Sequence, residues 1–368
     1  MLKIKRACLS CFFLSGMLTV SGQNIFKGYE NLFTEPTQYT VFHTTDAITI
    51  DGRAIEKTWE AIPWTADFVD IEGSRKPLPA LQTRMKMLRD ENNLYIFAEL
   101  EEPHVWATLT KHDAVIFHDN DFELFIDPDG DTHNYFEIEI NALNTIFDLF
   151  LSKPYRNGGA LLTTWNTENL KTAVQINGTL NNPADTDKGW TIEMAIPFAA
   201  LRIGSHFHTS PPANTLWRVN FSRVQWDTEI VNGKYKKKTN ASGKPLPEHN
   251  WVWSPQGLIN MHYPERWGYI RFAGKDEKPG NVPFFLPEEE TMKKYLWLLY
   301  YKQKEYQRSN KAYAKTLSAL NIPALITTRA ENKYIFKLEA NTTQFTGTII
   351  HNDKGNWAID HNGKIIKK

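Results

Sequence analysis

Hydrophobic and polar side chains alternate along two segments in the middle of the chain, 121–127 (DFELFID) and 134–141 (NYFEIEIN). A period of two is typical of half-buried antiparallel strands, because successive side chains point to opposite faces of a sheet. The Asp-Pro-Asp-Gly-Asp sequence that joins them has the residues of a turn. With an apolar segment that follows and ends at Leu151, this part of the chain predicts three consecutive strands.

One face of these central strands should be rich in polar groups. The alternation predicts that it carries Tyr135, Glu123, Glu137, Glu139 and Asn141. A face with so many carboxylates is solvated, binds a cation or binds a polar ligand, and the alternation alone leaves all three interpretations open.

Short segments of strand character surround this centre and are separated by Gly, Pro and Asn turns. The predicted strands are 46–50, 84–88, 94–100, 190–196, 216–226 and 267–272, with one helical turn in 55–62. Little helical periodicity interrupts them, so the sequence predicts an all-β fold, an antiparallel β-sandwich that spans residues 41–273. Residues 23–40 should form an extended lead-in. Four tryptophans at strand or turn positions are expected in the core: Trp59, Trp190, Trp217 and Trp267.

The chain changes character after the predicted sandwich. Residues 274–287 are rich in Lys, Glu and Pro and predict a linker. An amphipathic pattern and an acidic first turn predict a long α-helix over 288–321. Residues 322–368 predict a small tail of β strands in a meander, at 334–338, 346–350 and 357–360.

The first 22 residues have the features of a secretory signal peptide. Lys3, Lys5 and Arg6 form a basic start, residues 7–20 form an apolar run, and small residues precede Gln23. We therefore expect an exported protein, periplasmic or secreted after cleavage. Both cysteines, Cys8 and Cys11, lie inside this peptide, so the mature protein should have neither a disulfide nor thiol chemistry. No later stretch is long and apolar enough to predict a membrane span.

Charge argues against two kinds of partner. The 368 residues contain 42 Lys and Arg and 42 Asp and Glu, so the formal net charge is zero. Nucleic acids and anionic membranes attract a basic surface, which this balance does not predict. Twelve tryptophans are a high count for this chain.

Four segments together resemble a known family. They are 94–150 (LYIFAELEEPHVWATLTKHDAVIFHDNDFELFIDPDGDTHNYFEIEINALNTIFDLF), 188–198 (KGWTIEMAIPF), 217–226 (WRVNFSRVQW) and 250–272 (NWVWSPQGLINMHYPERWGYIRF). In this order they resemble the family 9 carbohydrate-binding modules, in particular the exported family 9-like proteins of Bacteroidetes-type bacteria. The resemblance covers about Val41 to Phe272 and leaves out the C-terminal helix and tail.

The resemblance implies a non-catalytic β-sandwich that binds a glycan and supports polysaccharide degradation. Family modules grip a sugar between two aromatic side chains, with polar groups beneath and structural calcium nearby. By position, the aromatic residues are Phe117, where the family usually has Trp, and Trp253. Trp106 is the alternative to Phe117. The polar partners carried over in the same way are Glu123, Glu137, Glu139 and Asn141.

The predicted turn also contains a candidate metal site. Asp127, Asp129 and Asp131 have the spacing with which a calcium loop begins, but Gly130 stands fourth and not sixth, so the segment is not an EF-hand. Plain turn chemistry is the first interpretation, and calcium bound by these oxygens is the second.

Two other classes of function stay open. Glu123 with Glu137 or Glu139 could serve as the acid and base of a glycoside hydrolase, since adjacent strands provide suitable spacing. Alternatively the sandwich and helix could form a scaffold in an envelope assembly, with tyrosines on the helix facing outward. These are Tyr300, Tyr301, Tyr306 and Tyr313.

Overall fold

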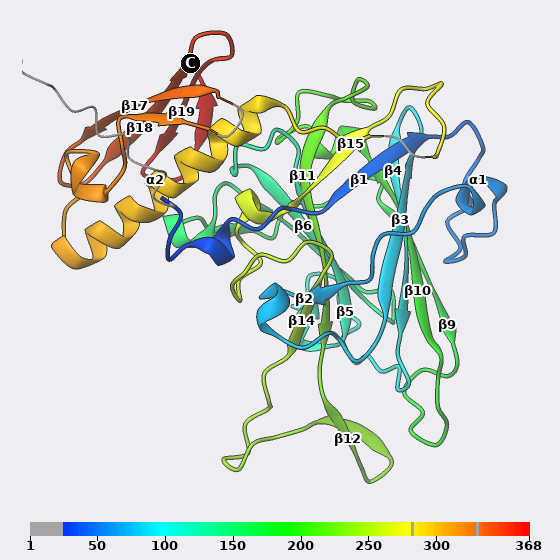
Figure 1. Ribbon diagram of the computed structural model, residues 1–368. Coiled ribbons are helices and arrows are strands. Elements are labelled where there is room, and N and C mark those ends of the chain that lie inside the picture. Colours follow the sequence, from blue (N-terminus) through cyan, green and yellow to red (C-terminus); the bar gives the residue numbers. More distant parts are fainter. Residues whose placement is uncertain (1–24, 281–282, 329–330) are drawn as a thin grey trace, which may run out of the picture.

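The computed structural model describes residues 25–280, 283–328 and 331–368, so the predicted signal peptide lies outside the described part of the chain. The chain forms a β-sandwich followed by a smaller C-terminal unit, which lies beside one end of the sandwich (Figure 1). The sandwich extends from β1 (Gln38–His43) to β15 (Gly268–Phe272), close to the limits that the sequence predicts.

Two layers of strands make up the sandwich, and β1 joins them. The first four residues of β1 pair in parallel with β15, and its last two pair in parallel with β3 (Thr83–Arg89). All other strand pairs are antiparallel, as the sequence predicts.

In order, the first layer contains β8 (Leu161–Leu162), β7 (Ile146–Leu151), β6 (Tyr135–Asn141), β5 (Asp121–Asp127), β11 (Leu216–Gln225) and β15. Strand β14 (His249–Val252) pairs with β11, and β2 (Val69–Asp70) pairs with β14. In order, the second contains β3, β4 (Asn93–Glu101), β10 (Gly189–Pro197) and β9 (Lys171–Asn177).

The main core lies between the layers. Leu124 and Ile138 from the first layer belong to the same buried cluster as Ile96 and Met194 from the second. The short helix α1 (Lys57–Glu60) contributes Trp59, which is buried with Trp190, Trp217 and Trp267. The prediction that these four tryptophans are core residues is confirmed.

The outer face of the first layer is buried as well, which the alternation did not predict. Every residue of β5 and β6 is buried. Loops bring apolar side chains onto this face and form a second cluster with the outward residues of the strands. Its members include Ile71, Ile116, Phe125, Tyr135, Met261 and Trp267. The interpretation of the polar face as solvated is therefore wrong, because segments distant in the sequence cover it.

The C-terminal unit is a five-stranded sheet with helix α2 (Glu288–Asn310) packed on it. Its strands are β16 (Leu325–Thr327), β17 (Lys333–Ala340), β18 (Phe345–His351), β19 (Gly355–Asp360) and β20 (Ile365–Lys367). The helix ends at Asn310 and not at residue 321, because Lys311 takes a left-handed conformation (φ 58°) and the Gln303 side chain bonds both backbone groups of Ala314.

Contacts to the sandwich and the sheet bury three of the four tyrosines that were expected to face outward. Tyr300, Tyr301 and Tyr313 are buried, and Tyr306 is half-buried. The Tyr301 hydroxyl donates to Glu265, which also accepts two hydrogen bonds from Arg156 of the sandwich. The predicted lead-in packs here too: it contains the short 3-10 helix η1 (Glu30–Leu32), and Tyr29 and Phe33 contact Tyr301.

Two further segments differ from expectation. Residues 46–50 form no strand. Strands β12 (Thr228–Val231) and β13 (Lys234–Lys237) form a hairpin that projects from the sandwich, at the lower end of Figure 1. No helix in the described ranges is long and apolar enough to cross a membrane.

Candidate functional site

Three carboxylates meet on the outer face of the first layer. Pairing of β5 with β6 sets Glu123 opposite Glu139 and Asp121 opposite Asn141. One carboxylate oxygen from each of Asp121, Glu123 and Glu139 lies within 4.8 Å of the other two. We call these residues the acid triad. They are only 0%, 4% and 3% exposed, so each carboxylate has lost almost all of its hydration.

A short 3-10 helix, η3 (Ile116–His118), lies over the triad. The Phe117 backbone N–H donates to Glu139 Oε2 at 2.9 Å, and the Val224 N–H donates to Asp121 Oδ1 at 3.2 Å. Two other triad oxygens, Asp121 Oδ2 and Glu123 Oε2, are buried without a hydrogen-bond partner in the described part of the chain. So is the hydroxyl of Ser222, which pairs with Glu123 from β11.

The triad has no basic partner: within the described ranges no Lys, Arg or His forms an ion pair with its members. Burial raises the pKa of all three carboxyls well above the usual range, and neighbouring carboxylates add to the effect. Arg223 directly follows Ser222 in the sequence and forms a buried ion pair with Glu102 (2.8 Å). It does not serve the triad, because it pairs with Phe122 and so faces the other side of the sheet.

The other predicted polar partners are also buried. Glu137 is opposite Phe125, and burial followed by the charge of Glu123 raises its pKa well above the usual range. The Asn141 amide donates to Leu109 O and to Asp119, and its oxygen accepts from two backbone N–H groups. Asn141 therefore fixes the loop that approaches η3.

Phe117 and Trp253, the two aromatic residues expected to grip a sugar, lie in different clusters. Trp253 is 3% exposed and packs in the main core, where Gly268 leaves room for its ring; a Cβ there would lie 2.4 Å from the ring. This placement does not support stacking of Trp253 on a sugar. Phe117 is half-buried and lies in a different cluster, together with Trp106.

That cluster contains two aromatic residues that the sequence analysis did not single out, Trp226 and Tyr235. The aromatic cluster, as we call it, consists of Trp106, Phe117, Val224, Trp226 and Tyr235. Trp226 Nε1 donates to Phe117 O at 2.8 Å, and Lys237 Nζ lies 3.3 Å from the Trp226 ring centroid. The position of Trp226 at the end of the predicted strand 216–226 was the available signal, but nothing local indicates that the β12–β13 hairpin folds back to place Tyr235 here.

Each aspartate of the turn after β5 accepts at least one local hydrogen bond. Asp127 accepts from the N–H groups of Gly130 and Thr132, and Asp129 accepts from Asp131 N. Asp131 accepts from His133 N and forms an ion pair with Lys364 of the tail at 3.3 Å. Turn chemistry accounts for this cluster, and calcium at these oxygens stays a prediction.

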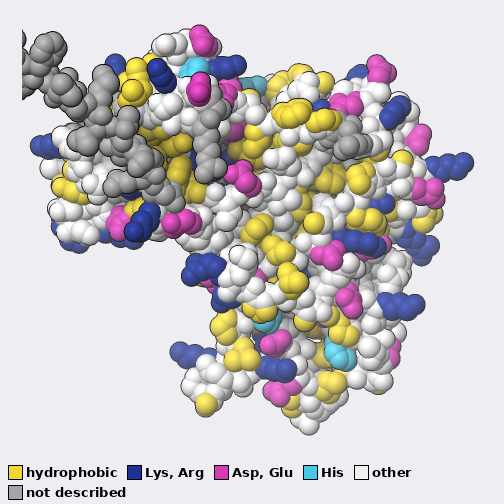
Figure 2. Space-filling view, in the orientation of Figure 1, with side chains coloured by type: hydrophobic (Ala, Val, Ile, Leu, Met, Phe, Trp, Pro, Cys, Tyr) yellow, Lys and Arg dark blue, Asp and Glu magenta, His cyan; other side chains and the backbone are white. Residues whose placement is uncertain are grey.

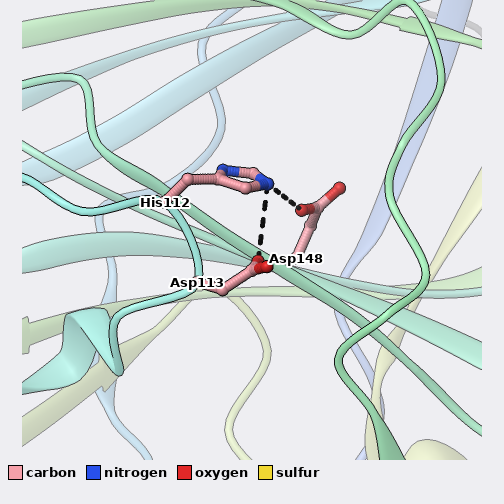
Figure 3. A group of neighbouring side chains, drawn as sticks. All are labelled: His112, Asp113 and Asp148. Atoms are coloured by element: carbon pink, nitrogen blue, oxygen red, sulfur yellow. Dashed lines mark ion pairs between the residues drawn. The ribbon is translucent and has the colours of Figure 1, made fainter.

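A histidine forms a third cluster with two carboxylates. Figure 3 shows His112 pointing toward Asp113 and Asp148, with Nε2 at 3.4 and 3.6 Å from their oxygens. A hydrogen bond to Asn166, followed by the two carboxylates, raises the pKa of His112. These contacts make the group an ion-pair cluster at the surface, in which His112 and Asp113 are exposed and Asp148 is buried.

The fold and the site define a β-sandwich domain with an aromatic cluster at one end of a layer. Residues 50–216 match the carbohydrate family 9 binding domain-like family. The match lies within the part of the chain for which the sequence resemblance indicates this family. No curated protein sequence matches the chain.

Three solved structures are similar to this chain. A proposed carbohydrate-binding protein of Bacteroides uniformis ATCC 8492 shares 16% identity, with 65% of this chain and all of that chain covered and a TM-score of 0.47. A family 9 module of Caldicellulosiruptor kristjanssonii, solved with cellotriose, shares 14% identity over 68% of this chain and all of its own (TM-score 0.40). The same module solved with glucose shares 13% over the same proportions (TM-score 0.39).

Proposed function

We propose that the protein binds a glycan without cleaving it, at the aromatic cluster on the end of the sandwich. The observation that carries this proposal is the match of residues 50–216 to the carbohydrate family 9 binding domain-like family. In this role the protein would support polysaccharide degradation by holding the glycan near enzymes that act on it.

The geometry favours Phe117 as the residue that contacts the sugar. Phe117 and Tyr235 are the half-buried rings of the cluster, whereas Trp106 and Trp226 lie almost fully buried against them. A partly exposed ring backed by rigid aromatic side chains suits stacking against the C–H face of a sugar. Figure 2 shows hydrophobic side chains mixed with charged and histidine side chains at the lower end of the molecule, where the hairpin projects.

Polar groups for the sugar hydroxyls lie beside these rings. His104 Nδ1 is 3.1 Å from the Tyr235 hydroxyl, and the exposed His118 ring lies 4.5 Å from that of Phe117. Lys237 covers Trp226. Glu123, Glu137 and Glu139, in contrast, are almost fully buried, and Glu139 accepts the Phe117 N–H. This burial favours a supporting role for these carboxylates beneath the rings.

The burial of these carboxylates also argues against a glycosidase activity. A glycosidase needs two carboxyl groups that flank the scissile bond and, in inverting enzymes, a water between them. Glu123 and Glu139 face each other beneath loops that leave each only a few per cent exposed. We therefore propose binding and not hydrolysis; release of reducing ends from a polysaccharide by the pure protein would contradict this.

The test is a glycan-array screen with the purified protein, followed by affinity electrophoresis in gels that contain the best polysaccharide. Phe117→Ala should weaken retention roughly 30-fold, since a central aromatic contact is typically worth about 2 kcal/mol. Tyr155→Ala is the matched control, because Tyr155 is a 40% exposed ring outside the cluster. Binding to no glycan, or equal retention of Phe117→Ala and the unchanged protein, would contradict the proposal.

We also propose export, on the basis of the basic and apolar pattern of residues 1–22. Expression in a Gram-negative host and N-terminal sequencing of the periplasmic fraction should find a mature chain that begins at Gln23. Full-length protein confined to the cytoplasm would contradict this.

A further inference from the structure

We propose that a cavity between the lead-in, helix α2 and the sandwich binds a small organic acid, and that Arg266 pairs with the carboxylate of this acid. The cavity has a volume of about 210 Å³, far more than the roughly 10–15 Å³ that a single water needs. None of the five residues of the aromatic cluster lines it. The proposal therefore concerns a second site and does not depend on carbohydrate binding.

Aromatic rings from two distant segments form walls of the cavity. Phe26 and Phe33 come from the lead-in, which runs alongside α2 before it enters β1 (Figure 1). Tyr295, Trp297 and Tyr301 come from α2. The rings pack on one another, with centroids 4.7 Å apart for Phe26 and Phe33 and 5.9 Å apart for Phe33 and Tyr301. Packed rings of this kind suit the apolar body of a small ligand.

The sandwich contributes a buried cation to the same cavity. Arg266 lines it and is only 4% exposed. Arg266 Nη2 donates to the backbone oxygen and the hydroxyl of Thr34, and Nε donates to Gln256 O. These acceptors are neutral, and in the described part of the chain no carboxylate forms an ion pair with Arg266. A buried charge is costly unless it is paired, and burial accordingly lowers the pKa of Arg266.

The buried acids of the cavity are already paired with other cations. Glu265 accepts two hydrogen bonds from Arg156, both at 2.8 Å, and a third from the Tyr301 hydroxyl. Glu290 forms an ion pair with Lys293 at 2.7 Å. Neither acid therefore supplies the counter-charge of Arg266, and an acidic ligand would supply it.

The free donor and the walls together define the class of ligand. Within the described ranges Arg266 Nη1 has no hydrogen-bond partner, so it remains for one charge-assisted bond, which a carboxylate accepts well. A phosphate group would bring about two charges and three acceptor oxygens, more than this one donor satisfies. The rings favour an apolar body over further polar groups. A monocarboxylate with an aromatic or aliphatic body matches both features.

Isothermal titration calorimetry on the purified full chain tests the site. The probes are benzoate and 3-phenylpropanoate, with benzamide as the neutral isostere of benzoate. We expect at least one carboxylate to bind with a Kd of about 1 mM or tighter, and benzamide to bind about tenfold more weakly or not at all, because it brings no charge to Arg266.

Two variants test the two features separately. Arg266→Gln keeps side-chain donors but removes the charge, so it should weaken carboxylate binding about tenfold or more. Thr291→Phe leaves Arg266 in place and fills the cavity from α2, so it should abolish binding. Arg271→Gln is the matched control, because Arg271 is also buried but does not line the cavity, and it should bind as the unchanged protein does. Thermal unfolding of each variant checks that it is folded.

The proposal is overturned if neither carboxylate binds, or if benzamide binds as tightly as benzoate. Unchanged affinity in folded Arg266→Gln or in Thr291→Phe would overturn it as well. Loss of binding in Phe117→Ala with full binding in Thr291→Phe would place the acid at the aromatic cluster, and would equally overturn the assignment to this cavity.

Discussion

Strand β5 has a cluster of carboxylates at each end, and the two clusters differ in their partners. At its start, Asp121 lies close to Glu123 and Glu139. In this cluster Asp121 Oδ2 and Glu123 Oε2 are buried without a described hydrogen-bond partner. At its end, Asp127 joins Asp129 and Asp131, whose oxygens accept backbone N–H groups or pair with Lys364. The residue types are similar, but the two clusters differ in burial, since Asp129 is exposed and Asp131 is half-buried, and in their hydrogen-bond partners.

The partners follow from backbone geometry at each end. In the turn, Gly130 takes a left-handed conformation (φ 65°), which turns successive N–H groups toward the Asp127 carboxylate. In the strands, the ladder between β5, β6 and β11 consumes the backbone N–H groups. Few donors therefore remain for the triad, apart from those of Phe117 and Val224.

The largest expected effect is at the turn. Asp127→Ala removes the acceptor of two N–H groups in a fully buried position, and we expect a loss of about 3 kcal/mol in the free energy of unfolding. Urea unfolding measures this change. Asp129→Ala is the control, since the exposed Asp129 accepts a single bond, and it should cost under about 1 kcal/mol. Equal losses in the two variants would contradict the account of the turn.

A buried carboxylate of the second layer extends the comparison. Glu193 accepts hydrogen bonds from Asp51 N, Gly52 N and Trp59 Nε1, yet burial raises its pKa to about 7. Because the folded pKa exceeds the unfolded one, the folded chain binds more protons between pH 4.5 and 7. The stabilisation that protonated Glu193 contributes is therefore complete below about pH 4.5 and is lost as the pH rises through 7.

We expect the free energy of unfolding to fall by about 2 kcal/mol from pH 5 to pH 7.5 because of Glu193. Urea unfolding at these pH values, compared with Glu193→Gln, isolates this contribution, since the variant cannot titrate there. An unchanged pH slope in Glu193→Gln would show that another group is responsible.

The smallest expected effect concerns the tail. Lys364→Ala removes the ion pair with Asp131, in which the lysine side chain is 42% exposed. Partly exposed pairs contribute little, so stability should fall by no more than about 0.5 kcal/mol. A loss above about 2 kcal/mol in urea unfolding would mean that this pair, and not the backbone bonds, holds the turn cluster.

Alternation along the chain predicted much of this fold. It separated Phe122, Leu124 and Ile126, which entered the core, from Glu123 and its neighbours on the other face. A pattern of residues cannot show what lies over that second face, because Ile71, Ile116 and Met261 come from loops far apart in the sequence.

The site was predicted only in part for the same reason. Phe117 and Trp106 do share a cluster, but Trp253 lies in the core because the distant Gly268 leaves space for its ring. Tyr235 reaches the cluster through the β12–β13 hairpin. These placements depend on tertiary contacts that local sequence does not encode.

The most direct test of the comparison is a high-resolution crystal structure of the protein, in which ordered solvent can be located. We predict that Asp121 Oδ2 and Glu123 Oε2 contact ordered solvent, whereas the Asp127 carboxylate accepts the N–H groups of Gly130 and Thr132. Triad oxygens without any partner, or an Asp127 carboxylate that lacks these two backbone bonds, would contradict the account.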